Sequence, residues 1–312
     1  MNTEVARVAT PAEREATIAR AVDYLRAGEI VALPTETVYG LAAGALNADA
    51  ALKIFEAKER PRFDPLIVHL PDHSWLDRLT KAADEPLVSG LIERFWPGPL
   101  TLVLPRRSIV PDVVTAGLET VAVRMSAHPI FAEILRELGS PLAAPSANRF
   151  GRISPTSAQH VFAELAGRIP LIVDGGPTQH GVESTIVATR DNTLEILRHG
   201  PITAEELAAF GRTREGRVGE RPNAPGQLVS HYAPRTPLVL VKDANAFQAA
   251  GKNVERFIQP DDLRKAAANF FRRLRELDES GCDLIVAQEI PEVGLGRAIM
   301  DRLRRAATHD AS

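Results

Sequence analysis

Apolar residues recur at intervals of three and four in several segments, the spacing that places them on one face of a helix. In residues 11–27 this face carries Ile18, Val22 and Leu25, and Gly28 follows as a stop signal. Each such helix has one face to bury against a neighbour. The same spacing predicts further helices at residues 47–60, 129–138, 157–168, 263–279 and 294–307.

Short continuous apolar runs separate these helices and are typical of buried strands. The runs are EIVALPTET, PLIVHL, PLTLVLP, TVAVRM, PLAAPSAN, PLIVDGG, STIVAT and LEILRHG, followed near the C-terminus by LVLV and DLIVAQ. The three runs between residues 170 and 200 follow one another closely, which favours antiparallel pairing there. The alternation predicts an α/β fold in which helices cover a twisted mixed sheet.

Residues 211–237 interrupt this alternation. The stretch is rich in Gly, Pro and Arg and has little periodicity, which is typical of an inter-domain linker. A shorter strand and helix pattern resumes after it. We therefore predict a large α/β domain at residues 11–210, a linker or lid at 211–237 and a small β/α domain at 238–309.

The composition narrows the class of protein. The chain has 312 residues, 45% of them hydrophobic, which is enough for two well-buried cores. Its 37 Lys and Arg against 40 Asp and Glu give a formal net charge of −3, which indicates neither a nucleic-acid coat nor a membrane surface. The single cysteine, Cys282, excludes an intramolecular disulfide. Without a signal peptide or a long apolar run, we expect a soluble cytoplasmic protein.

The most concentrated positive charge lies in the stretch KERPRFDPLIVHL. Lys58, Arg60 and Arg62 fall where a helix ends, and cations there complement the helix dipole. Pro61 stops the helix between the arginines, which favours a tight turn instead of a solvated face. Guanidinium forks and a lysine charge together suit a polyanion. His69 in the next strand is a core histidine unless it shares a pocket with these cations.

Two hydroxyl-rich loops are candidates for anion binding. The loop PSANRFGRISPTS precedes a helix and can direct donors at a phosphate, although Thr156 or Ser157 also suits helix capping. In DGGPTQHGVESTIV, Ser184 and Thr185 follow a glycine turn at the start of a strand, where ordinary turn chemistry also accounts for them. No G-x-x-x-x-G-K-[ST] pattern occurs, so a nucleotide site here is not a P-loop.

Other catalytic motifs are missing from the sequence. It contains no H-E-x-x-H, G-x-S-x-G or C-x-x-C pattern, which leaves a serine-hydrolase triad or a protein-held zinc unsupported. What remains is a cationic, hydroxyl-lined anion site without an obvious nucleophile. Such a site is expected where positioning and electrostatics dominate catalysis.

Seven ordered motifs give the chain a family resemblance. They are PTETVYGL, AKERPRFDPLIVHL, FWPGPLTLVLP, TVAVRMSAHP, APSANRFGRISPT, DGGPTQHGVESTIV and ILRHGPI. In this order they closely resemble the Sua5/YciO/YrdC family, and PGQLVSHYAPRTPL followed by PEVGLGRAIMDRLRRAA is similar to its two-domain Sua5 branch. The resemblance implies a YrdC-like α/β domain with a cationic cavity, joined through a linker that covers the active site to a Rossmann-like Sua5 domain.

The resemblance also implies an activity. Members of this branch are L-threonylcarbamoyladenylate synthases, nucleotidyltransferases that convert L-threonine, bicarbonate or CO2 and ATP into threonylcarbamoyl-AMP and pyrophosphate. The product starts the t6A modification at position 37 of tRNA. The expected cofactor is Mg²⁺ carried by ATP, with no metal held by the protein and no organic cofactor. The expected partners are the downstream threonylcarbamoyl transferase machinery, with weak or no direct tRNA binding and no membrane.

The family motifs assign roles to individual residues. Lys58 and Arg60 are the expected catalytic cations between threonine and the triphosphate. The residues expected to bind L-threonine are Thr35, His69, Arg124, Ala144 and Ser184. Those expected to contact ATP are Lys58, Arg62, Ser146, Asn148, Ser154, Arg198 and the linker residue Tyr232.

Two departures and two alternatives accompany this interpretation. Ser126 stands where the family usually has proline, a change expected to loosen that turn without removing Arg124. The C-terminal domain is shorter than usual around residues 242–262.

A cavity of this kind would also serve an RNA-binding protein, against which the near-neutral charge argues. Similar domains occur in carbamoyltransferases, whose substrate would be carbamoyl phosphate.

Overall fold

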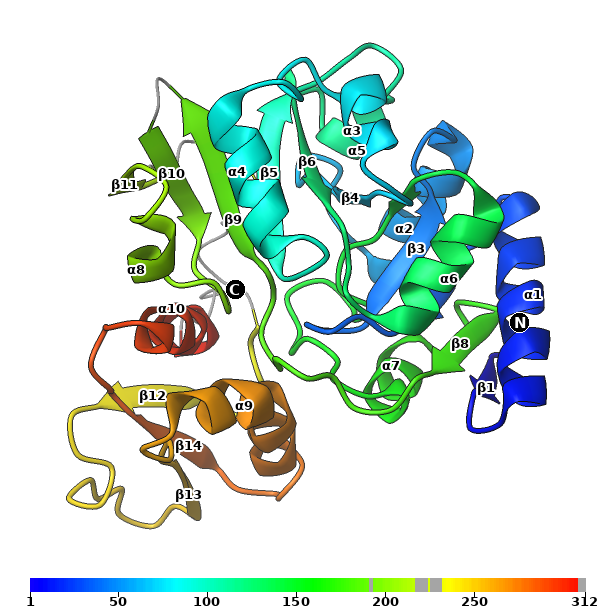
Figure 1. Cartoon of the computed structure of the whole chain (residues 1–312). Helices are drawn as coiled ribbons and strands as arrows, with labels where there is room; N and C mark the ends of the chain where they lie inside the picture. Colours follow the sequence, from blue (N-terminus) through cyan, green and yellow to red (C-terminus); the bar gives the residue numbers. More distant parts are fainter. Residues whose placement is uncertain (191–192, 217–223, 225–231, 308–312) are drawn as a thin grey trace.

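The computed structural model describes residues 1–190, 193–216, 224 and 232–307. Its N-terminal unit, residues 1–216, is built on a mixed sheet with the strand order β1-β8-β2-β3-β7-β4-β6-β5-β9-β10-β11 (Figure 1). The strands are β1 Glu4–Arg7, β2 Val31–Leu33, β3 Gly40–Gly44, β4 Ile67–His69, β5 Leu100–Pro105, β6 Thr120–Arg124, β7 Leu142–Ala143, β8 Leu171–Asp174, β9 Thr185–Arg190, β10 Thr193–Arg198 and β11 Arg212–Glu215.

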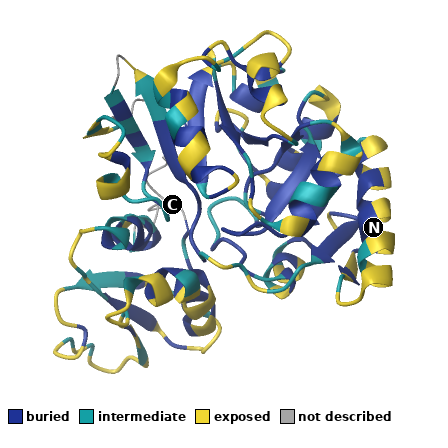
Figure 2. Cartoon of the chain, in the orientation of Figure 1, coloured by how far each residue is buried: buried dark blue, intermediate teal, exposed yellow. Residues whose placement is uncertain are grey.

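Helices pack against this sheet and leave their polar faces exposed, as the yellow outer side of α1 illustrates (Figure 2). The helices are α1 Pro11–Arg26, α2 Ala48–Lys58, α3 Ser74–Leu79, α4 Pro86–Phe95, α5 Asp112–Thr115, α6 Pro129–Leu138, α7 Ala158–Leu165 and α8 Ala204–Leu207. Helix α2 begins after Asn47, whose side chain accepts hydrogen bonds from two backbone N–H groups. It ends at Lys58 because Glu59 adopts a left-handed conformation (φ 55°). The turn therefore comes two residues earlier than the predicted stop at Pro61.

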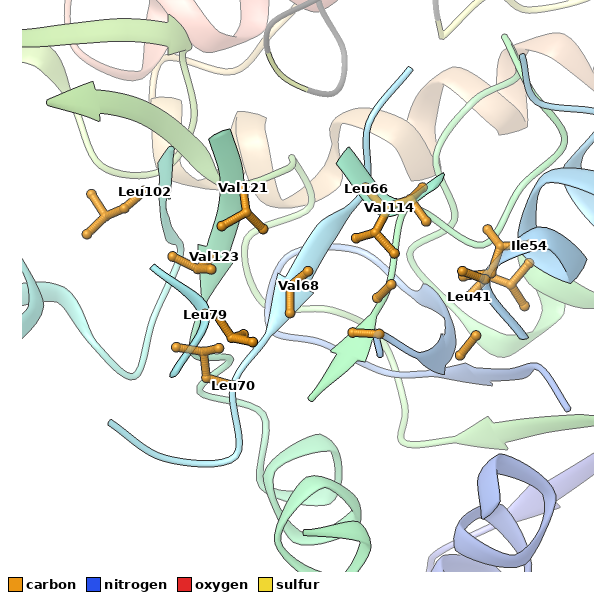
Figure 3. Close-up of a cluster of buried hydrophobic side chains, with 14 of the residues drawn as sticks. Leu41, Ile54, Leu66, Val68, Leu70, Leu79, Leu102, Val114, Val121 and Val123 are labelled. Carbon is orange, nitrogen blue, oxygen red and sulfur yellow. The ribbon is translucent and has the colours of Figure 1, made fainter. Parts of the chain in front are cut away.

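The core of the N-terminal unit lies between the sheet and these helices. Leu41 on β3, Val68 on β4, Leu102 on β5 and Val123 on β6 pack with Ile54 of α2 in one cluster (Figure 3). Each of these side chains is fully buried. At about 1.5–3 kcal/mol for each buried aliphatic side chain, this packing fixes the central strands and the residues at their ends.

A second, parallel sheet forms the C-terminal unit, residues 238–307. Its strand order is β12-β14-β13, and helices α9 and α10 pack on it. Its core cluster contains Phe270 and Ile299 and extends to Val38, Ile153 and Val182 of the N-terminal unit. The two units therefore share a hydrophobic core. The elements are β12 Leu238–Val241, β13 Val254–Phe257, α9 Leu263–Asp278, β14 Leu284–Gln288 and α10 Leu295–Ala307.

Most predicted elements are confirmed, and two predictions of topology are wrong. The predicted antiparallel pairing holds for β9 with β10, whereas β8 pairs in parallel with β1 and β2 on the other side of the sheet. The segment between β8 and β9 is long enough to cross the sheet. Residues 212–215, predicted as linker, form edge strand β11, whose sequence RTRE has no apolar alternation to reveal it.

Three further strands, β1, β3 and β13, were not predicted. Residues 217–223 and 225–231 of the predicted linker lie outside the described residues. The predicted domain boundaries stay a prediction. Among the helices of the described ranges, none combines the length and apolarity needed to cross a bilayer.

Gly181→Ala is expected to loosen the docking of α9 on the N-terminal unit. Gly181 has a φ of +67°, and a Cβ there would lie 2.3 Å from the carbonyl oxygen of Ala268. Strain and clash together should lower the free energy of unfolding by about 3 kcal/mol, measured by urea denaturation. The matched control is Gly176→Ala in the same loop, where φ is +82° and nothing lies within 4 Å of the added Cβ. An equal loss in both variants would contradict the close approach.

Candidate active site

A cavity opens where the ends of β4 and β6 meet the loops that follow β2 and β7 and precede β9. Its volume is about 510 Å³ when the part open to solvent is included, and most of the residues predicted for the site line it. The structure brings together Thr35, Arg60, His69, Arg124, Ala144, Ser146, Ser184, Arg198 and Tyr232. These residues come from segments far apart in the sequence, so their convergence supports a single site.

Lys58 lies in the wall behind this cavity. Its Nζ donates to the carbonyl oxygens of Ser146 (2.6 Å) and Asn148 (2.5 Å), which ties the end of α2 to the loop after β7. Burial and the charge of Arg60 hold the pKa of the Lys58 amine well below its usual range, and Asp64 opposes them in part. An anion bound beside this amine would therefore favour its charged form.

Arg60 is fixed by backbone oxygens and by Asp64. It donates to the carbonyl oxygens of Asp64 (3.2 Å) and Pro65 (2.8 Å), and its Nη2 lies 2.9 Å from Oδ2 of Asp64. This ion pair lacks hydrogen-bond geometry, and neither carboxylate oxygen of Asp64 has a hydrogen-bond partner among the described residues. Burial raises the pKa of Asp64 although Arg60, Lys58 and Arg198 oppose it. The Arg60 guanidinium is thus fixed in position, but Asp64 compensates its charge only in part.

Arg124 and His69 occupy paired positions on the adjacent strands β6 and β4. The Arg124 guanidinium donates to the Gly98 carbonyl (3.2 Å), to Thr37 Oγ1 (3.0 Å) and to Glu36 Oε1 (2.5 Å). All three of its nitrogens are therefore engaged, which fixes the plane of the fork. A fixed guanidinium at a cavity wall suits the carboxylate of a small ligand.

Ser126 contributes to this arrangement, and the expectation that it loosens the turn relative to proline stays a prediction. Its Oγ donates to Oε2 of Glu36 and accepts from the backbone N–H of His128 (3.3 Å). Burial raises the pKa of Glu36, but Arg124 and Ser126 outweigh burial and bring that pKa to about 2. The Glu36 carboxylate thus stays ionised at neutral pH and keeps Arg124 in position.

His69 presents a neutral imidazole. Burial and the charge of Arg124 lower the pKa of His69 to about 3, against a smaller opposing effect of Glu36. One face of the ring packs on Phe131 at a centroid distance of 4.7 Å. Its Nδ1 has no hydrogen-bond partner in the described part of the chain. The residue lines the cavity, where a neutral imidazole suits a hydroxyl or amine of a bound ligand.

Ser184 and Arg198 also line the cavity, from positions just before β9 and at the end of β10. Ser184 Oγ accepts from Arg198 Nη2 (3.0 Å) and lies 2.8 Å from Thr101 Oγ1. Arg198 Nε also donates to the Ser184 carbonyl (3.0 Å). Burial lowers the pKa of Arg198, while Tyr232 and Glu183 oppose it. Arg198 is therefore the third buried guanidinium of the cavity, after Arg60 and Arg124, and it has a hydroxyl beside it.

Besides Lys58, three predicted ATP contacts do not line the cavity. Ser154 is buried and donates to Glu183 Oε1. Asn148 is buried and its amide donates to two carbonyl groups of its own loop (2.9 and 2.8 Å). Arg62 has an exposed side chain. Their roles toward ATP stay predictions.

Tyr232 comes from the linker and lines the cavity with a buried ring. Its φ of +63° lies in a region that large side chains seldom adopt, at a strain of about 1–3 kcal/mol. The ring packs on Phe271 of α9, with centroids 5.3 Å apart, and the guanidinium carbon of Arg302 of α10 lies 5.7 Å from the ring centroid. The N–H of the next residue, Ala233, donates to the Gly151 carbonyl (2.8 Å). Burial raises the pKa of Tyr232 to about 12, so the phenol keeps its proton.

Three buried acids of the site escaped the sequence reasoning: Glu36, Asp64 and Glu183. Each stands inside a motif already singled out, PTET, RFDP or VEST. These acids could have been found from the requirement that a cation buried in such a motif needs a compensating acid nearby. Arg302 gave no such signal, because it lies 119 residues from its partner Glu183.

Two family profiles match the chain. The profile for Sua5, YciO and YrdC proteins, described as "Telomere recombination", matches residues 23–200. The profile described as "Threonylcarbamoyl-AMP synthase, C-terminal domain" matches residues 202–308. The chain belongs to the Sua5/YciO/YrdC family.

Similar members of the Sua5/YciO/YrdC family span almost the whole chain. A protein of Bacillus subtilis (strain 168) named threonylcarbamoyl-AMP synthase is 44% identical and covers 93% of this chain and 92% of its own length. A protein of the same name from Pyrococcus abyssi is 41% identical, over 92% of this chain and 93% of its own length. Both parts of the chain therefore have counterparts in these relatives.

Solved structures of the Sua5/YciO/YrdC family share the architecture. The crystal structure of P. abyssi Sua5 complexed with L-threonine superimposes with a TM-score of 0.90 at 38% identity and covers 98% of both chains. E. coli YciO superimposes with a TM-score of 0.54 at 22% identity, over 64% of this chain and 96% of its own. The second likeness supports the fold alone.

His69→Gln is expected to make the protein less sensitive to acid. The unfolded chain takes up a proton on His69 near pH 6.5, whereas the folded state resists it down to about pH 3. The wild type should therefore lose stability as the pH falls through this window, by up to about 1.4 kcal/mol per pH unit. Glutamine has no such proton to take up. Urea unfolding at pH 7.5, 6 and 5 measures the difference, and parallel pH profiles would contradict the assignment.

Proposed function

We propose that this chain is a threonylcarbamoyl-AMP synthase. It combines L-threonine, bicarbonate or CO2 and ATP into threonylcarbamoyl-AMP and pyrophosphate, the first step of t6A formation in tRNA. The relatives named for this activity align with more than nine-tenths of the chain. The match of residues 202–308 to the C-terminal domain of such synthases supports the same conclusion.

The gathering of these cations in and beside one cavity is the observation that carries this proposal. Arg124 is a fully hydrogen-bonded fork beside the neutral imidazole of His69, which suits an amino-acid carboxylate and hydroxyl. Arg60 and Arg198 in the cavity lining, with Lys58 behind it, provide buried positive charge for a polyphosphate. The same cavity thus offers groups suited to both substrates.

The reaction needs no nucleophile from the protein. The threonine amine adds to CO2 to give a carbamate, a carbamate oxygen attacks the α-phosphorus of ATP, and pyrophosphate leaves with the bond to that phosphorus. This transfer of AMP places the protein among nucleotidyltransferases. Lys58 and Arg60 would hold the carbamate and the phosphates together and neutralise the charge that develops between them.

Magnesium would enter as part of the ATP substrate. Among the described residues no group of three or more His, Cys, Asp or Glu is placed to hold a metal ion. The cations of the cavity suit phosphate oxygens that Mg²⁺ leaves free. With a net charge of −3, we expect weak or no direct tRNA binding, and the product would pass to a threonylcarbamoyl transferase.

We propose that the linker closes the site over ATP. Tyr232 lines the cavity, and Ala224, the other described linker residue near it, is fully buried against a cluster that includes Ile67 and Ile186 of the sheet. Both residues therefore lie against the face of the sheet on which the cavity opens. Their position suits a segment that excludes water from the bound phosphates.

The activity is tested by incubating the protein with Mg·ATP, L-threonine and bicarbonate. Pyrophosphate should appear only when all three substrates are present, and mass spectrometry should find a product that contains both AMP and threonine. Release without threonine, or a product made instead from carbamoyl phosphate, would refute the proposal. A tRNA gel shift that weakens steeply with salt would favour a nucleic-acid role instead.

Lys58→Met is expected to lower the rate constant kcat/KM by roughly 10²–10³-fold, because it removes a charge from a water-poor site. The matched control is Lys53→Met on the same helix, where the lysine forms a half-exposed ion pair with Glu29 (2.7 Å). This control should retain wild-type kinetics. A loss of stability in Lys58→Met without a rate effect would mean that Lys58 only fastens α2 to its neighbouring loop.

A further inference from the structure

Arg302 of α10 is the largest fully buried side chain among the described residues, and it reaches out of the C-terminal unit into the N-terminal unit. Its Nε and Nη2 donate to Oε2 of Glu183 (3.2 and 3.1 Å), and its Nη1 donates to the carbonyl oxygen of His199. Both acceptors lie beside site residues, Glu183 next to Ser184 and His199 next to Arg198. The guanidinium is therefore anchored in the wall of the cavity.

Glu183 is itself part of that wall. It lines the cavity, is 6% exposed, and accepts a hydrogen bond on its other oxygen from Ser154. A carboxylate here lines the same cavity as Arg60 and Arg198, which would receive the phosphates. Without a cation behind it, its charge would repel those phosphates at short range and low dielectric.

Arg302 also supports the linker residue. Its guanidinium carbon lies 5.7 Å from the centroid of the Tyr232 ring, while Phe271 of α9 packs on the same ring at 5.3 Å. Tyr232 holds a positive φ that the surroundings must maintain. The two C-terminal helices thus contact the one described linker residue that lines the cavity.

Two other ion pairs join the units but lie away from the cavity. Arg275 of α9 pairs with Glu164 (3.2 Å), and Arg297 of α10 pairs with Glu205 (2.5 Å). Neither acid lines the cavity. These two pairs therefore already help to hold the units together. Of the three pairs, only Arg302 with Glu183 places its acid in the cavity wall.

We propose that Arg302 is a positioning residue of the nucleotide site: it neutralises Glu183 and supports Tyr232, so that the C-terminal unit completes the ATP-binding wall. This inference rests on the proposed function. It assigns the C-terminal unit a role in binding ATP and none in binding threonine, because among the described residues Thr35, His69 and Arg124 find their hydrogen-bond and ring partners within the N-terminal unit.

Removing Arg302 and removing the charge of Glu183 should affect ATP affinity differently, and this difference provides the test. Arg302→Met leaves an unpaired carboxylate facing ATP, so the Kd for ATP should rise about 100-fold while the KM for threonine changes less than about threefold. Glu183→Gln removes the repelling charge, so ATP affinity should stay within about threefold of the wild type. In Arg302→Met/Glu183→Gln no unpaired charge remains, and most of the lost ATP affinity should return.

Isothermal titration with Mg·ATP gives these dissociation constants, with urea denaturation as a measure of folding. The control is Arg297→Met, which removes an ion pair from the same helix and should bind ATP like the wild type. If Arg302→Met does not fold, the comparison of Glu183→Gln with the double variant still decides, because the proposal predicts near wild-type affinity for both.

Equal losses of ATP affinity in Arg302→Met and Glu183→Gln, or a double variant no better than Arg302→Met, would overturn the inference and leave a purely structural ion pair. If the wild type is active and Arg302→Met binds ATP normally, the inference about Arg302 is overturned and the proposed function stands. A wild type that forms no threonylcarbamoyl-AMP would overturn the proposed function, and this inference with it.

Discussion

Burial of positive charge is the constraint on which the rest of this structure depends. Removing a guanidinium or an ammonium from water costs several kcal/mol, so each such group needs partners that the fold must deliver. The buried cations and their partners are Lys58 with two backbone carbonyls, Arg60 with Asp64, Arg124 with Glu36, Arg198 with Ser184, and Arg302 with Glu183. Because these partners come from separate segments, the site exists only in the folded chain.

The topology of the sheet satisfies this constraint. Strands β4 and β6 are neighbours, which sets His69 beside Arg124, and the crossing from β8 to β9 carries Glu183 and Ser184 to the far wall. The early end of α2 at Glu59 turns Arg60 inward. The C-terminal unit then contributes a cation of its own, so its docking depends on electrostatics in the cavity as well as on the shared hydrophobic core.

The sequence revealed the parts of this arrangement that local chemistry controls. Periodic apolar faces predicted the helices, continuous apolar runs predicted the central strands, and the motifs supplied the residues that line the cavity. It could not reveal strand β11, whose polar residues pair by backbone bonds at a sheet edge, or the parallel pairing of β8. The hydrogen bond from Ser126 to Glu36 was missed because a hydroxyl that binds a buried carboxylate has no local signature. Arg302 was missed because its partner is set by how the two units dock.

The partners of the buried cations differ in how firmly they hold them, and this difference suits the cations to different tasks. Arg124 is bound on every nitrogen, and Glu36 remains ionised, so the guanidinium meets a ligand without rearranging. Asp64 faces Arg60 without a hydrogen bond between their side chains, and Lys58 has a lowered pKa beside it. Phosphate oxygens would strengthen the charge of both groups by replacing weak internal partners. Rigid recognition by Arg124 and incompletely compensated charge at Arg60 and Lys58 thus follow from the same need to compensate buried cations.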